Sequence, residues 1–190
     1  RGGAAFFAAE HDATPADFHE FVSRVDLVRN YPGSVGLGFA PRIRPGDRTA
    51  FTQWLSSRGL SGIRMHPESP SDRDAFPVIY LEPQKQSDLS ALGFDMFSDP
   101  IRRQAMERAR DRAEAAASGT INLSEDAAGV RQPVFVLYAP VYRDAVPDAA
   151  PQRRDSLTGF VYTPLHLGEF LRGALGPPDE SLTRFSLYEG

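Results

Sequence analysis

The chain has 190 residues, no cysteine and a formal net charge of −4 at pH 7. A chain of this length forms one sizeable domain or two small ones. The missing cysteines exclude disulfides, cysteine-ligated zinc and thiol catalysis, and the acidic balance argues against a nucleic-acid partner, because nucleic-acid-binding domains usually carry a basic face.

The hydrophobic fraction of 41% is ordinary for a soluble globular chain, and no run of about 18 apolar residues predicts a membrane span. The sequence begins at Arg1, without an initiator methionine or a signal peptide. We therefore expect a piece of a longer protein, whose flanking segments could include membrane anchors. The composition leaves the compartment open, because a periplasmic protein can lack disulfides.

The first third of the chain predicts helices that flank a strand. Residues 1–9 are rich in alanine and phenylalanine and indicate the end of a helix. Thr14-Pro15-Ala16-Asp17 supplies a cap, a proline for the first helical position and an acid for the first turn, which together predict a helix start. The expected elements are helices over 14–30 and 47–58, a strand over 34–41 and a short strand over 63–66.

The central part, residues 76–117, organises the rest of the prediction. Residues 78–81 are β-formers between two prolines and predict a strand. Ser98 or Asp99 can cap a helix that has Pro100 in its first position, and an apolar stripe continues this helix to about residue 117. The arginines of 102–112 alternate with acids, which indicates a solvated helix face.

The last third predicts strands separated by short connections. Residues 133–143 are apolar on both faces of the expected strand, which favours a central place in a sheet. The other expected elements are strands over 120–124, 157–162 and 182–188, a hairpin-like turn over 125–131, a loop over 144–155 and a helix over 167–175. This order of helices followed by adjacent strands predicts an α+β fold with a largely antiparallel sheet.

Several separated motifs of the chain resemble, in order and spacing, the CHASE domain. One of them is Ala91-Leu92-Gly93-Phe94-Asp95. The others lie at 31–42, 77–83, 98–103, 137–143 and 157–161. The CHASE domain is the extracytoplasmic sensor module of membrane histidine kinases and diguanylate cyclases and is best known from plant cytokinin receptors. The resemblance covers roughly residues 1–175.

This resemblance implies a PAS-like sensor, with antiparallel sheets flanked by helices and two PAS-like subdomains in tandem after a mostly absent stalk helix. Residues 1–13 would be the end of the stalk and a linker. Residues 14–145 would form the membrane-distal subdomain with the ligand pocket, and 146–190 an incomplete membrane-proximal one. The resemblance further implies a periplasmic or extracellular location and a homodimer formed through the stalk helices. It implies no cofactor, no catalysis by the domain itself, and membrane contact only through segments outside this chain.

Asp95 is the first candidate for ligand binding. It matches the acid that hydrogen-bonds the adenine ring in the plant receptors, which implies an adenine-like or cytokinin-like small molecule. An acceptor between Phe94 and Met96 also suits an apolar pocket that recognises N–H groups. The alternative hypothesis is that Asp95 caps or charges the following helix end.

The other candidates are apolar or aromatic residues of the strands. The predicted ligand-binding set is Asp95, Tyr80, Met96, Leu123, Phe135, Leu137 and Tyr138. Central-strand residues such as Phe135 and Leu137 usually serve only as core. Glu82 could be a second polar anchor or a strand-end residue paired with an arginine.

Other function classes find less support in the sequence. The four histidines are scattered without metal-ligand spacing, no Gly-x-Ser-x-Gly motif is present, and no glycine-rich segment matches a phosphate-binding pattern. Two hypotheses remain ahead of an enzyme. The first is a sensor domain that binds a small molecule, and the second is a ligand-free module for interaction or dimerisation in a membrane receptor.

Overall fold

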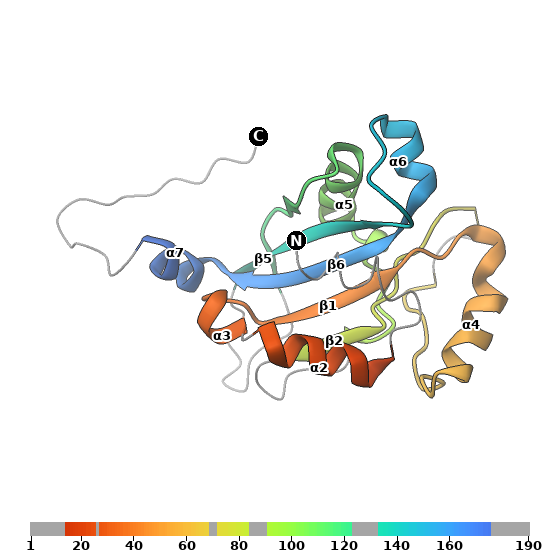
Figure 1. Cartoon of the computed structure of the whole chain (residues 1–190), viewed down its shortest axis with the longest axis horizontal. Helices are drawn as coiled ribbons and strands as arrows, with labels where there is room; N and C mark the ends of the chain where they lie inside the picture. Colours follow the sequence, from red (N-terminus) through yellow and green to blue (C-terminus); the bar gives the residue numbers. More distant parts are fainter. Residues whose placement is uncertain (1–13, 26, 69–71, 84–90, 123–132, 176–190) are drawn as a thin grey trace.

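An antiparallel sheet of six strands forms the centre of the fold in the computed structural model, in the order β2-β1-β6-β5-β3, with β4 also paired to β5. The structure describes residues 14–175 except residues 26, 69–71, 84–90 and 123–132. The strands are β1 (Gly36–Pro41), β2 (Tyr80–Pro83), β3 (Ala116–Ala117), β4 (Ile121–Asn122), β5 (Pro133–Tyr142) and β6 (Leu157–His166). Figure 1 shows the sheet with helices around it, which confirms the predicted α+β fold and is consistent with a PAS-like sensor.

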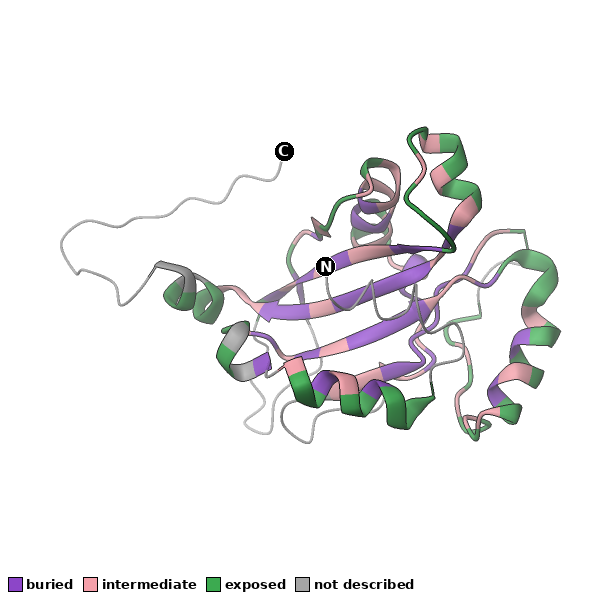
Figure 2. Cartoon of the chain, in the orientation of Figure 1, coloured by how far each residue is buried: buried purple, intermediate pink, exposed green. Residues whose placement is uncertain are grey.

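Helices cover the sheet on both faces. The α-helices are α2 (Pro15–Val25), α3 (Leu27–Asn30), α4 (Arg48–Ser57), α5 (Pro100–Arg112), α6 (Ala150–Ser156) and α7 (Leu167–Leu175), and the 3₁₀-helices are η1 (Pro45–Asp47) and η3 (Met96–Ser98). Figure 2 shows purple, buried positions along the central strands and green, exposed positions on the outer sides of the helices. This is the pattern expected when each helix buries one stripe against a sheet.

The two faces of the sheet have separate cores. We call them the α5 face and the α2 face after the helices that cover them. Side chains alternate between the faces along each strand, and residues directly opposite on paired strands share a face. The α5 face includes Phe76, Met96, Ala105, Met106, Val136, Tyr138, Phe160 and Tyr162. The α2 face includes Phe18, Val22, Phe39, Phe51, Leu55, Tyr80, Val141 and Val161.

Strand β6 lies between β1 and β5, and it pairs with β1 from Gly159 to Tyr162 and with β5 along its whole length. The described chain therefore contributes to one sheet through residue 166, past the subdomain boundary predicted near residue 145. A second, membrane-proximal subdomain stays an expectation. The strand predicted over 182–188 and the stalk end predicted over 1–13 lie outside the described residues.

The predicted helix through residue 117 is wrong at its end. Helix α5 ends at Arg112, and Ala113 follows with a left-handed φ of 56°. Ala116 and Ala117 then form β3, opposite Tyr138 and Leu137 of β5. Alanine favours a helix, so pairing with the edge of β5 overrides the local preference of these residues.

Two further expectations need correction. The loop predicted over 144–155 contains α6, where the side chain of Arg153 donates hydrogen bonds to the carbonyl oxygens of Pro147, Asp148 and Asp111. The short strand predicted over 63–66 is reduced to an isolated bridge between His66 and Phe94. In both places contacts between distant parts of the chain determine the structure, which local sequence patterns do not contain.

Gly93 connects three separate segments in front of helix α5. Its N–H donates to the carbonyl of Val78 over 2.7 Å, and its own carbonyl accepts from His66 over 2.9 Å. Its φ is +86°, and a Cβ at this position would overlap the backbone carbonyl of Arg64. Only glycine combines this conformation with such a close approach of a second backbone.

We therefore expect Gly93→Ala to lower the free energy of unfolding by at least about 2 kcal/mol, because it adds backbone strain to a steric overlap. Gly62→Ala is the matched control, since a Cβ there meets nothing within 4 Å. Urea unfolding of both variants measures the difference. Equal stabilities of the two variants would contradict this account of Gly93.

Candidate functional site

Asp95 is completely buried in the connection that leads from the sheet to helix α5. Its Oδ1 accepts hydrogen bonds from the N–H of Phe76 at 2.8 Å and from the N–H of Phe97 at 3.0 Å. The second of these bonds caps η3, a short 3₁₀-helix that precedes the predicted helix. Asp99, and not Asp95, caps α5, through bonds from the N–H groups of Ile101 and Arg102. Ligand binding by Asp95 stays a prediction.

The structure divides the predicted ligand-binding residues between the two faces of the sheet. Met96 and Tyr138 belong to the core of the α5 face. Tyr80 belongs to the α2 face, where its ring stacks on Phe18 with the centroids 5.4 Å apart.

Phe135 and Leu137 also lie on the α2 face. Their register partners on β6 are Leu165 and Thr163, which alternate in step with Val161 of that core. The ring of Phe135 contacts Phe170 of α7 edge-on. The predicted ligand-binding residues Phe135 and Leu137 therefore do not form one surface with Tyr138, because adjacent positions of a strand point to opposite faces.

Two other candidates take different places. Leu123 lies outside the described residues. Glu82 contacts the Nδ1 atom of His19 at 3.0 Å, so its partner at the strand end is a histidine of α2 and not an arginine.

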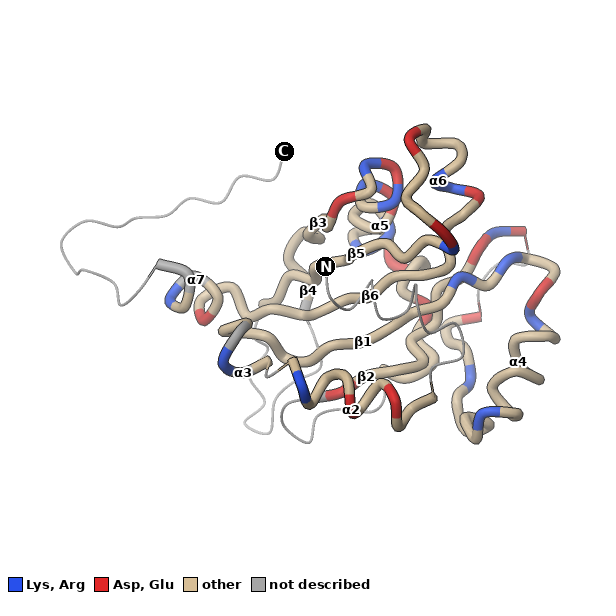
Figure 3. Tube along the Cα trace, in the orientation of Figure 1, with Lys and Arg blue, Asp and Glu red and all other residues tan. Residues whose placement is uncertain are grey.

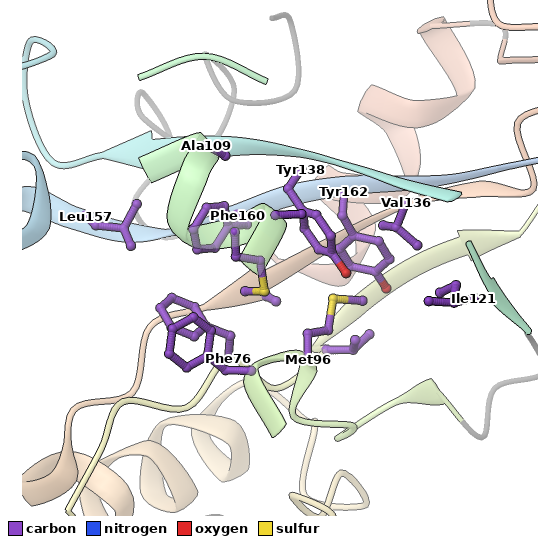
Figure 4. Packing of buried hydrophobic residues seen from close by; sticks show 14 of the residues in the cluster. Phe76, Met96, Ala109, Ile121, Val136, Tyr138, Leu157, Phe160 and Tyr162 are labelled. Atoms are coloured by element: carbon purple, nitrogen blue, oxygen red, sulfur yellow. The ribbon is translucent and has the colours of Figure 1, made fainter. Parts of the chain in front are cut away.

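Two buried tyrosines stand side by side on the α5 face. Tyr138 of β5 and Tyr162 of β6 are register partners, and their ring centroids are 6.4 Å apart. The ring of Tyr162 covers Gly38 of β1, where a Cβ would overlap it. Figure 4 shows both hydroxyls pointing in the same direction, on the side of the sheet where Met96 lies.

Neither of these phenol oxygens meets the distance and angle of a hydrogen bond with a described residue, although the Arg102 side chain lies close enough to Tyr138 to interact with its hydroxyl. Tyr138 is 0% exposed and Tyr162 is 3% exposed, so solvent does not satisfy them either. A buried polar group without a partner costs about 1–3 kcal/mol. The pair is therefore an unusual feature of an otherwise apolar core.

Arg102 supplies a third unpartnered polar atom. It lies one helical turn before Met106, whose side chain packs on the sheet, and the two positions share one side of α5. Its side chain is 13% exposed, and its Nε has no hydrogen-bond partner among the described residues. The predicted solvated face is therefore wrong for Arg102.

The charge of Arg102 is only loosely balanced. Its Nε is 4.0 Å from Oδ2 of Asp99, beyond hydrogen-bond distance. Its guanidinium carbon is 5.1 Å from the ring centre of Phe94, in a cation–π contact. The guanidinium remains able to donate to a further acceptor.

Burial raises the pKa of Tyr138 and of Tyr162 well above the ordinary value of a phenol, while Arg102 acts in the opposite direction, on Tyr138 through its charge and its hydrogen-bonding side chain and on Tyr162 through its charge. Both hydroxyls therefore stay protonated at physiological pH and can donate. Together with the Arg102 guanidinium they form a group of donors, which we call the Tyr–Arg cluster.

Apolar side chains line the same region. Met96, Ile121 and Val136 belong to this core, and Figure 4 shows them beside the two tyrosines. Figure 3 shows the charged residues on the helices and connections, while β1, β5 and β6 carry none. Within the described part of the chain, no three side chains of His, Cys, Asp or Glu come together in a way that could hold a metal ion.

Tyr162 and Arg102 are not among the residues predicted from the sequence. The signal for Tyr162 was the alternation of Phe160 and Tyr162 in a strand, which marks one face. No local signal reveals Arg102, because it is one of several arginines on α5 and the sequence does not distinguish it from the others.

The antiparallel sheet with its flanking helices places the chain in the α+β class and is consistent with a PAS-like domain. The family model of the CHASE domain matches residues 11–190, and the chain therefore belongs to the CHASE domain family. CHASE domains are extracytoplasmic sensor domains of membrane receptors and are not catalytic. No curated protein matches the chain. In the described residues, no helix has both the length and the apolar character needed to cross a membrane.

Asp95→Ala should lower the free energy of unfolding by about 2–5 kcal/mol, because it leaves two buried backbone N–H groups without an acceptor. Asp95→Asn retains an acceptor oxygen and should cost less. Asp99→Ala, at a partly exposed cap, should cost about 1 kcal/mol and is the matched control. Chemical denaturation measures all three variants, and a loss in Asp95→Ala no larger than in Asp99→Ala would contradict the anchoring role.

Tyr162→Phe should leave the free energy of unfolding unchanged or raise it, because the hydroxyl it removes has no partner in the described structure. Tyr142→Phe is the control, since the hydroxyl of Tyr142 donates to the carbonyl of Arg110 at 2.6 Å. Its loss should cost about 0.5–1.5 kcal/mol. Equal destabilisation in the two variants, measured by thermal and urea unfolding, would show that the Tyr162 hydroxyl is bonded in the folded chain.

Proposed function

We propose that this CHASE domain is the ligand-binding sensor of a transmembrane receptor, and that a small molecule binds on the α5 face of the sheet at the Tyr–Arg cluster. The observation that supports this most directly is the set of three unpartnered polar atoms, on Tyr138, Tyr162 and Arg102. Ligand pockets are mostly apolar and contain a few polar groups that fix orientation. A ligand that accepts hydrogen bonds here would remove the cost of leaving these atoms unbonded.

Asp95 lies in the connection that leads to helix α5, next to Met96, and is proposed to define one wall of the site. Its two backbone bonds hold η3 against the strand segment at Phe76. An adenine-like ligand, as the family resemblance implies, would need a carboxylate oxygen for its N–H groups. Asp95→Asn is the substitution that probes this role, since it keeps an acceptor for the backbone.

Signal transfer would begin with helix α5, because Arg102 is part of this helix. The other end of α5 is joined to α6 through Asp111, whose carboxylate accepts from Arg154 at 2.7 Å and from Arg110 at 2.7 Å. These guanidinium groups, Arg154 first, hold the pKa of Asp111 well below its usual range. A shift of α5 would therefore move α6 and the adjoining ends of β5 and β6.

The output of the receptor is proposed to be a histidine kinase or a diguanylate cyclase, reached through stalk helices that also form a homodimer. A ligand can change this output only by its difference in affinity for the two signalling states. A ligand-free dimerisation module is the competing function, and it predicts no small molecule that stabilises the domain.

We expect at least one member of a panel of purines and small metabolites to raise the melting temperature of the 190-residue chain. A ligand at about 100 times its Kd adds about 2.7 kcal/mol of stability. The same compound should stabilise the control Tyr142→Phe as much as the unaltered chain and should stabilise Tyr162→Phe clearly less. A panel without any stabilising member, together with unchanged signalling of the receptor carrying Tyr162→Phe, would favour the ligand-free module.

A further inference from the structure

The Tyr–Arg cluster is composed of donors and carries positive charge. The phenols of Tyr138 and Tyr162 are buried and protonated, and the guanidinium of Arg102 is charged at every physiological pH. A neutral ligand would satisfy the hydrogen bonds but not the charge. An oxyanion satisfies both, because each of its oxygens accepts more than one hydrogen bond.

The acids near the cluster, Asp95 and Asp99, do not supply it with a hydrogen-bond acceptor. Oδ1 of Asp99 accepts from two N–H groups of the first turn of α5, and its Oδ2 is 4.0 Å from Nε of Arg102. Oδ1 of Asp95 accepts from two other backbone N–H groups. Both acids already have structural tasks that fix their positions.

The apolar side chains beside the cluster indicate the chemistry of the remaining part of the ligand. Met96, Ile121 and Val136 are buried apolar side chains of the same core. Figure 4 shows Met96 near the hydroxyl ends of the two tyrosines, and Val136 and Ile121 on the side of Tyr162. A ligand that reaches the cluster would therefore place an apolar body against these side chains.

From this combination we infer that the domain recognises a small carboxylic acid, whose carboxylate accepts hydrogen bonds from Tyr138, Tyr162 and Arg102 and whose apolar body packs against Met96, Ile121 and Val136. This inference rests on the proposed function and narrows it to one ligand class. It places the recognition of the ligand at donors on the sheet and on α5, and leaves Asp95 its structural role.

The test measures binding to the 190-residue chain by thermal shift and calorimetry. The probes are benzoate, phenylacetate and hexanoate, each compared with its primary amide, and adenine is included as a separate arm. The amides have nearly the same shape as the acids but no charge. We expect one or more of the acids to bind and to raise the melting temperature, with binding at least about tenfold weaker for the matching amide.

The variants separate the three donors from their neighbours. Tyr138→Phe and Tyr162→Phe should each weaken binding of the acid about tenfold, and Arg102→Met should abolish it. Tyr142→Phe and Arg103→Met are the matched controls, because the first removes a hydroxyl outside the cluster and the second removes an arginine whose guanidinium lies over Phe97. Both should bind as the unaltered chain does. Circular dichroism of Arg102→Met checks that it folds, and Arg102→Lys, which keeps the charge, should restore part of the binding.

Each result decides between the alternatives. Binding of an acid that depends on all three residues supports the inference. Equal affinity for an acid and its amide, or undiminished binding by Arg102→Met, overturns it. Absence of a shift with every acid at about 10 mM also overturns it. Stabilisation by adenine alone would overturn the carboxylate while leaving the proposed sensor function standing.

Discussion

The buried carboxylate of Asp95 is the interaction on which the arrangement around the site depends. It accepts from the N–H groups of Phe76 and Phe97 and so joins the segment before β2 to the start of η3. Helix α5 begins immediately afterwards, with Asp99 as its cap. Because a carboxylate with two backbone donors tolerates little displacement, the position of α5 over the sheet, and with it that of Arg102, follows from this contact.

The sheet supplies the two tyrosines of the site, and the ring of Tyr162 packs against Gly38, which has no side chain. Gly38 leaves the surface of β1 open, and the ring of Tyr162 occupies that space beside Tyr138. Polar atoms in such a core are costly unless they are bonded. Their presence there is more easily understood as part of a recognition surface than as a contribution to stability, and the apolar residues around them provide the shape of that surface.

Some elements of the fold were predicted from the sequence and others were not. The strand over 133–143 and the helix over 47–58 were predicted well, since a continuous apolar run marks the first and apolar residues at helical spacing mark the second. The end of α5 and the existence of α6 were missed, because they depend on the edge of β5 and on bonds from Arg153 to distant carbonyls. The two faces of the sheet were not separated, so Phe135 and Leu137 were placed with Tyr138, although alternation along the strand divides them.

By itself the sequence determined the α+β class, the family and the importance of the motif that ends in Asp95, because these depend on residue types in a fixed order. Only the tertiary structure decided what that motif does and which side chains meet. The anchoring of Asp95 needs Phe76, which lies 19 positions away along the chain. The Tyr–Arg cluster brings together two strands and a helix, and such a meeting depends on strand register and helix packing, which no local pattern encodes.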